Sequence, residues 1–333
     1  MKILIADKFE KAGIDGLRLL GCELIHEPDV GADGLAASLD KNKPILLVVR
    51  STKVPAATVN AAREAGVKVI VRAGAGVDNI DVAAATQAGI KVCNCPGMNA
   101  IAVAELAFGL ILACDRRIVE QTLDARTGKW NKKEYGRTGL GGAKGLKGAT
   151  LGVVGAGAIG RAVIKRAVAF EMEVVVWSRG ITPEHTRDIG AVFGGTETPD
   201  LLNMAARCDF ITIHLPLAPD TKGLIGTAFF ERMKPGATIV NTSRGGVIDE
   251  AALREAMKSK GIRAGLDVWE GQPGSSQTAP GEWPNETARL PLVAATHHIG
   301  ASTDQAQDAI AREVVRMVWM YKASGRVENS VNA

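Results

Sequence analysis

The sequence predicts an α/β fold made of two parallel-sheet domains, Rossmann-like or flavodoxin-like in type. Short apolar strands alternate with helical segments along most of the 333 residues, the pattern of parallel strands joined by helical crossovers. A glycine-rich turn opens only the second series of strands, so we expect the first series to be a separate unit. At this length and with 46% hydrophobic residues, two domains can each bury a sizeable core.

The expected strands form one group before residue 96 and another after residue 150. Each is a run of apolar and β-branched residues, as in KILIAD near the N-terminus. We expect strands over 2–7, 45–50, 68–73 and 90–95 in the first group, and over 151–154, 174–177, 210–215, 237–242, 264–268 and 292–296 in the second.

A long apolar helix is expected between the two groups. It runs from about Asn99, as its N-cap, to Arg116 and Arg117, whose charges suit the last turn of a helix. Because it is apolar on all sides, we interpret it as an interdomain or intersubunit helix. The segment 128–148, rich in Gly and Lys and without a clean period, is predicted to be a long loop that wraps something such as a partner subunit.

A second helix is expected after the last strand. The run Ser302-Thr-Asp-Gln305 has the sequence of a capping box, and an amphipathic pattern follows it. The residues expected on its apolar face are Ala306, Ile310, Val314, Met317 and Tyr321.

Composition argues against several classes of partner. The net charge of +4 is spread along the chain without a long basic run, so no nucleic acid partner is expected. The longest apolar stretch is about thirteen residues and contains Glu105, so we expect no membrane segment and a cytoplasmic protein. Cys93 and Cys95 lie on one strand face and a zinc pair is conceivable, but no second pair completes a site. We therefore expect no metal and five reduced cysteines.

The glycine-rich turn has the spacing of a dinucleotide site. The strand 151–154 runs into Gly155-Ala-Gly-Ala-Ile-Gly160 and then into a helical pattern. The first glycine permits the tight turn, the second permits close approach of a pyrophosphate, and the third permits the helix to pack on the strand. The residues expected to bind the cofactor here are Gly155, Gly157, Ala158, Ile159 and Gly160.

The next strand ends in Ser178 and Arg179, where the residue that selects between nicotinamide cofactors is expected. An acidic residue would accept from the ribose 2′-hydroxyl, whereas a small residue followed by arginine admits a 2′-phosphate. The pair therefore predicts that NADP(H) is preferred and NAD(H) possible. The alternative is that Arg179 is only a solvated charge at a strand end.

The chain resembles the D-2-hydroxyacid dehydrogenase family, and within it the D-3-phosphoglycerate dehydrogenases. The resemblance rests on several motifs in order, among them RSTKV (50–54), NTSRGGVIDE (241–250), AGLDVWEGQPG (264–274) and HHIGASTDQAQ (297–307). It implies that residues 1–98 and 299–333 form a substrate domain into which a cofactor domain, 99–298, is inserted, with the active site in the cleft between them. Longer members of the family continue into regulatory domains, so serine feedback through such a domain is not expected.

The resemblance also implies roles for single residues. Arg244 matches the arginine that holds the substrate carboxylate, and its planar fork suits that group. His298 matches the acid/base histidine, although His297 rather than proline precedes it. The backbone amides of Ala75 and Gly76 match the carboxylate-binding turn, with an ordinary turn as the alternative. The further cofactor contacts it implies are Thr242, Ser243, Asp267 and Gly300. The alternative for Asp267 is a buried helix-capping aspartate.

One family position differs. Where the family has a glutamate that pairs with the histidine, this chain has Gln272, an arrangement that resembles the glutamine–histidine pair of formate dehydrogenase. We expect Gln272 to accept from the imidazole Nδ1 proton through its amide oxygen, and to stabilise the imidazolium less than a carboxylate would. Glu270, two residues earlier, is the alternative partner.

The resemblance implies an NAD(P)-dependent 2-hydroxyacid dehydrogenase or 2-oxoacid reductase that is a homodimer. Arg50 and Lys53 suggest a phosphorylated substrate such as 3-phosphoglycerate, with Arg116 assisting. The alternative is that Arg50 and Lys53 are only surface charges. Reduction of glyoxylate or hydroxypyruvate is the alternative activity. The alternative of another class is a non-catalytic dinucleotide-binding regulatory protein, suggested by the missing glutamate.

Overall fold

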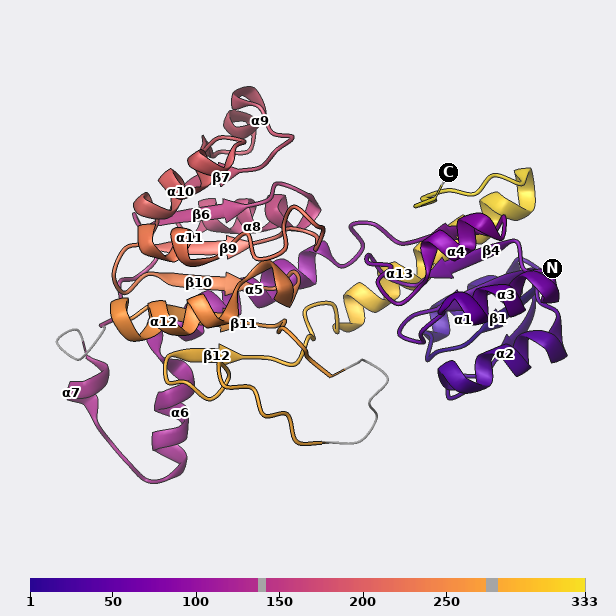
Figure 1. The fold of residues 1–333 in the computed structure, drawn as a ribbon, viewed down its shortest axis with the longest axis horizontal. Coiled ribbons are helices and arrows are strands. Elements are labelled where there is room, and N and C mark those ends of the chain that lie inside the picture. The colour runs from indigo at the N-terminus through magenta and orange to yellow at the C-terminus, as the bar shows by residue number, and fades with distance from the viewer. Residues whose placement is uncertain (137–141, 274–280, 333) are drawn as a thin grey trace. The chain divides into compact units, whose positions relative to one another are not determined.

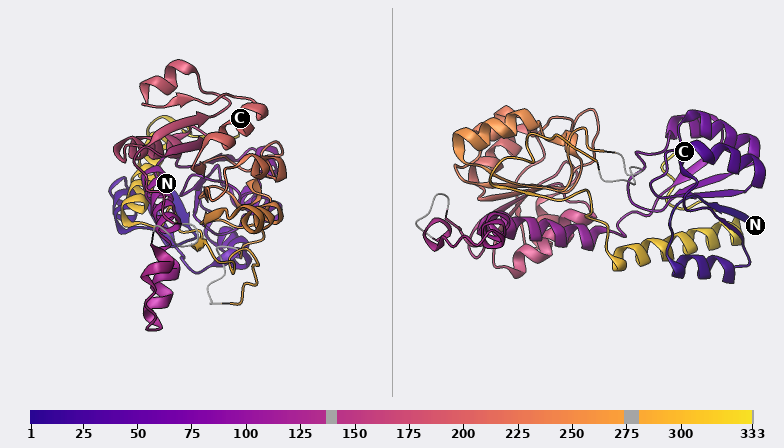
Figure 2. Two further views of the ribbon diagram at one scale, coloured as in Figure 1. Left: turned by 90° about the vertical axis from the view of Figure 1, so that its left-hand side faces the viewer. Right: turned by 90° about the horizontal axis from the view of Figure 1, so that it is seen from below.

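The computed structural model describes residues 1–136, 142–273 and 281–332. Contacts within the chain divide it into two compact units. The first unit comprises Met1–Asn99, Pro273–Gly281 and Ser302–Ala333, and the second comprises Ala100–Gln272 and Glu282–Ala301. Each unit contains its own parallel sheet with helices on both faces (Figures 1 and 2).

The sheet of the first unit has five parallel strands in the order β2-β1-β3-β4-β5. This is the flavodoxin-like order, in which ligands bind at the carboxyl ends of the strands. The strands are β1 (Lys2–Ile5), β2 (Glu23–His26), β3 (Leu46–Val49), β4 (Val69–Arg72) and β5 (Lys91–Cys93).

Helices cover both faces of this sheet. The long C-terminal helix α13 (Asp304–Ser324) packs against α1 (Lys11–Leu19) and buries Ile310 and Val314. Its N-cap is Thr303, which accepts a hydrogen bond from the Ala306 N–H at 3.2 Å, so the predicted capping box was placed one residue too early. The other helices are α2 (Gly31–Asn42), α3 (Ala56–Ala65) and α4 (Val82–Gln87).

The sheet of the second unit is also parallel throughout, with the order β12-β11-β10-β9-β6-β7-β8. The chain reverses its direction of travel across the sheet at β6, and this switch point is where doubly wound sheets bind nucleotides. The strands are β6 (Thr150–Val154), β7 (Glu173–Trp177), β8 (Val192–Phe193), β9 (Phe210–Ile213), β10 (Thr238–Asn241), β11 (Arg263–Leu266) and β12 (Val293–Ala295).

The apolar helix α5 (Ala100–Arg116) belongs to the core of the second unit. It packs against α8 (Ala158–Ala169) and strands β10 to β12, and Phe108 stacks on Phe170 at 5.1 Å between ring centroids. Asn99 directly precedes the first residue of α5, where the N-cap was predicted, but its buried Oδ1 accepts no hydrogen bond within the described residues, so its side chain does not cap the helix. The remaining helices on this sheet are α9 (Pro183–Asp188), α10 (Thr198–Arg207), α11 (Thr227–Arg232) and α12 (Glu250–Lys260).

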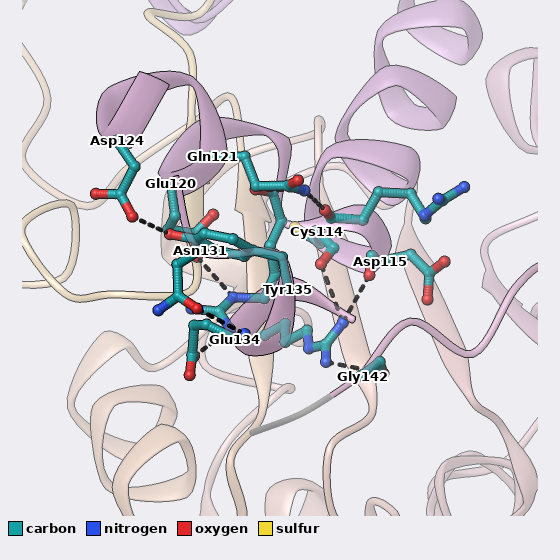
Figure 3. Close-up of polar contacts among 12 residues, drawn as sticks. Cys114, Asp115, Glu120, Gln121, Asp124, Asn131, Glu134, Tyr135 and Gly142 are labelled. Atoms are coloured by element: carbon teal, nitrogen blue, oxygen red, sulfur yellow. Dashed lines mark hydrogen bonds and ion pairs between the residues drawn. The ribbon is translucent and has the colours of Figure 1, made fainter. Parts of the chain in front are cut away.

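Beyond α5 the chain forms two further helices, α6 (Ile118–Arg126) and α7 (Lys132–Tyr135). The Tyr135 hydroxyl donates to Asp124 at 2.8 Å and joins the two helices (Figure 3). The predicted loop over 128–148 therefore contains a short helix, and its residues 137–141 lie outside the described residues. The guanidinium of Arg263 on β11 donates to the backbone oxygens of Cys114, Asp115 and Gly142 and fixes the end of α5.

The cysteines are free and buried. Burial raises the pKa of the Cys93, Cys95, Cys114 and Cys208 thiols to about 12, so these groups stay protonated near neutral pH. Within the described part of the chain, no group of three or more histidine, cysteine or acidic side chains is placed to hold a metal. None of the described helices is both long and apolar enough to span a bilayer.

Candidate functional site

The glycine turn has the geometry that a pyrophosphate site requires. Gly155 has φ +100°, and a Cβ there would lie 2.5 Å from the His214 carbonyl oxygen. A Cβ on Gly160 would lie 2.0 Å from the Gly155 oxygen, so helix α8 can approach the strand only through a glycine. Above Gly157, in contrast, a Cβ would meet nothing within 4 Å. The first and third glycines serve packing, and the second leaves room for a ligand before the α8 N-terminus, which begins with Ala158 and Ile159.

His214, at the end of β9, is a part of this turn that the sequence analysis missed. Its Nε2 lies 2.9 Å from Thr212 Oγ1, and its Nδ1 is buried without a hydrogen bond among the described residues. Burial lowers the pKa of His214 to about 3, so the ring is neutral in the working range. His214 is therefore a buried residue whose carbonyl oxygen packs closely against Gly155. It cannot serve as the acid of the site.

Ser178 and Arg179 follow β7, next to the glycine turn. The guanidinium of Arg179 forms an ion pair with the carboxylate of Asp220, and its Nη2 donates to the Asp220 backbone oxygen at 3.4 Å. Arg179 is therefore not a lone solvated charge. The Ser178 backbone N–H donates to Gly195 O at 3.3 Å, just beyond the ends of β7 and β8.

The turn after β10 carries Thr242, Ser243 and Arg244. Asn241 holds it, with its Nδ2 donating to Arg244 O at 2.9 Å and its Oδ1 accepting from the Ser243 hydroxyl at 2.7 Å. The Thr242 hydroxyl is buried and has no hydrogen-bond partner within the described residues, as expected of a group that a bound cofactor would satisfy. The guanidinium of Arg244 donates to Ser243 O at 2.8 Å.

Gly245 brings this turn against the loop after β11. A Cβ on Gly245 would lie 2.1 Å from the carbonyl carbon of Trp269, so only glycine allows the two backbones to touch. Arg244 and Gln272 therefore leave neighbouring strands on loops that are in direct contact.

Asp267, at the end of β11, shapes the turn that carries His298. Its carboxylate accepts from the Thr296 hydroxyl at 2.7 Å, the Ile299 N–H at 2.9 Å and the Gly300 N–H at 3.0 Å. Its backbone oxygen accepts from the His298 N–H at 2.8 Å. The competing expectation was a buried helix-capping aspartate. Asp267 is buried and binds backbone N–H groups, but these belong to the turn at 299–300, before α13 begins at Asp304. Contacts of Asp267 and Gly300 with nicotinamide stay predictions.

Gln272 is the side chain beside His298, with Nε2 of the amide 2.6 Å from Nδ1 of the imidazole. The amide oxygen accepts from the Trp269 backbone N–H at 3.0 Å. Because a backbone N–H can only donate, the oxygen belongs on that side and the NH₂ group faces the imidazole. The expectation that Gln272 would accept from His298 through its oxygen was therefore wrong. The alternative partner, Glu270, has an exposed side chain, and its backbone N–H donates to Glu250 at 2.7 Å.

The donated hydrogen bond assigns the proton of the neutral imidazole. Nδ1 of His298 must accept from Gln272, so Nε2 carries the proton. His298 also has a left-handed backbone with φ +55°, which lifts its side chain from the turn and leaves it exposed.

In the first unit, the turn after β4 presents Ala75 and Gly76. The Asn94 side chain donates to Ala75 O at 2.5 Å, and the Cys95 N–H donates to Gly74 O at 2.9 Å. The carbonyl groups of Gly74 and Ala75 are thus bound by the two residues that follow β5. In the part of the chain that the structure describes, the Ala75 and Gly76 N–H groups make no hydrogen bond. They are suited to an anionic ligand.

The loop after β3 is held differently. The Asp7 carboxylate accepts from all three backbone N–H groups of 50–52, the shortest at 2.7 Å. A phosphate at this loop would therefore have to bind through side chains. Arg50 Nη1 lies 3.4 Å from Glu10, whereas the Lys53 side chain is exposed.

The suggestion that Arg116 assists this loop stays a prediction, because Arg116 belongs to the second unit and the loop to the first. Arg116 is the last residue of α5, and that end of the helix is bound by Arg263 at the first residue of β11. Arg116 therefore lies at the amino ends of the strands of the second unit's sheet, on the opposite edge from Arg244 and His298.

Residues 108–300, more than half of the chain, match the model of the NAD-binding domain of D-isomer specific 2-hydroxyacid dehydrogenases. The chain belongs to this family. The second unit therefore contains the family's NAD-binding domain, and the parallel sheets agree with the fold that the resemblance implied.

Relatives with different names align with most of the chain. A D-3-phosphoglycerate dehydrogenase of Archaeoglobus fulgidus is 40% identical over the whole chain, which spans 59% of that relative's length. A hydroxypyruvate reductase of Thermotoga maritima is 43% identical over 82% of the chain and 83% of its own length. Among solved structures, the NAD⁺-bound 3-phosphoglycerate dehydrogenase of Entamoeba histolytica has 27% identity and a TM-score of 0.78, covering 100% of this chain and 99% of that one.

The chain carries Gln272 at the position where the resemblance implied a glutamate. Neighbouring strands β10, β11 and β12 place Arg244, Gln272 and His298 at one edge of the sheet. The sequence analysis named all three. It missed Trp269, whose backbone N–H orients the amide, and Asp220, the partner of Arg179. Asp220 lies 41 residues from Arg179 in another loop, so the sequence gives no local signal for this contact. Trp269 lies only three residues before Gln272, but its role depends on how that loop folds.

Proposed function

We propose that the chain is an NAD(P)-dependent D-2-hydroxyacid dehydrogenase that works as a 2-oxoacid reductase. The observation that carries this proposal is the placement of Arg244 beside the Gln272–His298 pair, on the sheet edge that also carries the glycine turn. The guanidinium suits a substrate carboxylate, and the imidazole Nε2 suits the reacting carbonyl oxygen. The cofactor, when bound, supplies or receives the hydride.

In this proposal the first unit is the substrate domain and the second the cofactor domain. The N–H groups of Ala75 and Gly76 would hold the substrate carboxylate together with Arg244. The Nε2 proton of His298 would polarise the carbonyl during reduction, because Gln272 keeps Nδ1 as the acceptor. Protonation of Nδ1 would place two donors face to face, so Gln272 would have to rotate and release Trp269.

A kinetic panel tests the proposed function. Glyoxylate, hydroxypyruvate and the 2-oxo acid of 3-phosphoglycerate are each mixed with NADH or NADPH, and the loss of reduced nicotinamide absorbance is followed. Turnover of at least one of these acids is expected. Cofactor binding without turnover of any acid would instead favour the non-catalytic regulatory protein.

We propose a phosphorylated substrate, 3-phosphoglycerate or a similar acid, with glyoxylate and hydroxypyruvate as the alternatives. Because the backbone donors of the β3 loop are bound by Asp7, the Lys53 and Arg50 side chains must supply the contact. Lys53→Ala should raise the KM for the phosphorylated acid about tenfold and leave that for glyoxylate nearly unchanged. Lys68→Ala, at the exposed start of β4, is the matched control. Equal losses for both acids would indicate a structural role for the loop.

Gln272→Glu should move the falling limb of the reductive pH profile upward by about one unit. One carboxylate oxygen can still accept from Trp269 N–H while the other accepts from a protonated Nδ1, so the imidazolium of His298 gains a partner. The protonated imidazole donates its proton to the product alkoxide. The pH range in which reduction is fast should therefore extend to higher pH. Rate profiles of both proteins across neutral pH measure the shift. Superimposed profiles, with a shift in Glu270→Ala, would make Glu270 the partner.

We propose that NADP(H) is preferred over NAD(H), supported by Ser178 and Arg179 beside the glycine turn.

We also propose a cytoplasmic homodimer that pairs through α6 and the segment after it. No residue of α6 is buried, and the side chains of Leu123 and Trp130 are 57% and 89% exposed. Exposed apolar groups of this size on a projecting helix indicate an interface. Light scattering of the purified chain would reveal a monomer if this is wrong.

A further inference from the structure

Two loops meet across the strand that carries the glycine turn. Arg179 follows β7 and Asp220 lies in the loop after β9. In the sheet, β7 and β9 are the two neighbours of β6, which runs directly into Gly155. The Arg179–Asp220 ion pair therefore links the two sides of the strand end at which the adenosine half of a dinucleotide is expected.

The loop of Asp220 has a defined structure. The hydroxyl of the next residue, Thr221, donates to Pro216 O at 2.6 Å and accepts from the Ala218 N–H at 2.8 Å. Thr221 is 3% exposed, so it anchors the loop in the unit. Asp220 is thus held near Arg179 by a folded turn.

We infer that Asp220 is a specificity-determining residue that competes with the cofactor 2′-phosphate for Arg179. The inference rests on the proposed NAD(P) dependence. The two side chains are 51% and 60% exposed, and an exposed ion pair of this kind contributes little to folding. A ligand can therefore displace the carboxylate at small cost.

The competition acts on only one of the two cofactors. The 2′-phosphate is a stronger ligand for guanidinium than a carboxylate, because it carries more charge and three acceptor oxygens. To bind Arg179 it must first displace the Asp220 carboxylate. NAD has no group that needs the guanidinium, so it leaves the ion pair intact. Asp220 thereby reduces the preference for NADP that Ser178 and Arg179 create.

Calorimetric titration with 2′,5′-ADP and with 5′-ADP tests this inference without turnover. Asp220→Asn should tighten 2′,5′-ADP about tenfold and change 5′-ADP less than about twofold. The matched control is Asp188→Asn, which removes the same charge from the exposed end of α9. Unchanged affinity for 2′,5′-ADP in Asp220→Asn would overturn the inference. Equal tightening of both nucleotides would also overturn it, since that is a general charge effect.

Arg179→Ala separates competition from direct repulsion. If Asp220 acts by occupying Arg179, the Asp220→Asn change should have no effect on 2′,5′-ADP once Arg179 is alanine. A tenfold effect that persists in the double variant would overturn the inference. Failure of the unmodified protein to bind either nucleotide would instead contradict the proposed function, and the inference with it.

Discussion

His298→Asn is expected to lower the reductive kcat by a factor of about 10²–10⁴, the range that a positioned acid or base contributes. Asparagine is chosen because it tolerates the left-handed backbone that His298 adopts, with φ +55°. The His298 N–H bond to the Asp267 oxygen, at 2.8 Å, should therefore survive and keep the turn folded. Steady-state rates with the best 2-oxo acid of the kinetic panel measure the loss.

His297→Asn is the matched control. His297 is exposed and immediately precedes His298, so the change alters the same turn without touching Gln272. We expect its kcat to stay within about twofold of the unmodified value, as for a surface change away from the site. Titration with NADH and NADPH should show that both variants retain cofactor binding. Similar losses in the two variants would mean that the turn, rather than the His298 imidazole, limits the rate.

Most strands of both sheets were predictable because parallel strands buried on two faces are continuous apolar runs. Leu46–Val49 and Phe210–Ile213 are examples in which every residue is buried. The strands that the sequence analysis did not find lack this signal. In β2 (Glu23–His26) no residue is fully buried, and both residues of the short edge strand β8 (Val192–Phe193) are exposed. Pairing with a neighbour, rather than burial, makes them strands.

Helix α6 was not predicted for a related reason. It has no buried face, so the apolar period that marks a helix is weak there. The two expected caps failed for another reason. Asn99 and Ser302 are residue types that favour an N-cap. Asn99 stands directly before α5 but its Oδ1 accepts no hydrogen bond in the described part of the chain, and the N-cap of α13 is Thr303 rather than Ser302. Residue type alone does not decide which side chain reaches a free N–H.

The candidate site was predictable in its residues but not in its orientation. Strand ends and motifs pointed to Gln272 and His298, yet the proton position depends on the Trp269 backbone N–H. The pairing of Arg179 with Asp220 likewise joins residues 41 positions apart. The Arg179–Asp220 contact follows from the sheet order β9-β6-β7, which strand patterns alone do not give.

Ser178→Asp combined with Arg179→Ala is expected to reverse the preference for NADP over NAD. A charge-assisted hydrogen bond contributes about 1.5–3 kcal/mol, so its loss should lower kcat/KM with NADPH about ten- to hundredfold. The new carboxylate at 178 can accept from the ribose 2′-hydroxyl of NADH and repel a 2′-phosphate.

The ratio of kcat/KM for the two cofactors, measured with one 2-oxo acid, decides this prediction. Arg187→Ala is the matched control, because Arg187 is an exposed arginine of α9 whose partner, Glu184, lies in the same helix at 3.6 Å. It should leave the ratio unchanged. If the unmodified protein already uses NADH as well as NADPH, or better, then Ser178 and Arg179 do not select the cofactor. The ion pair with Asp220 would then be a contact that closes the strand end over an unphosphorylated ribose.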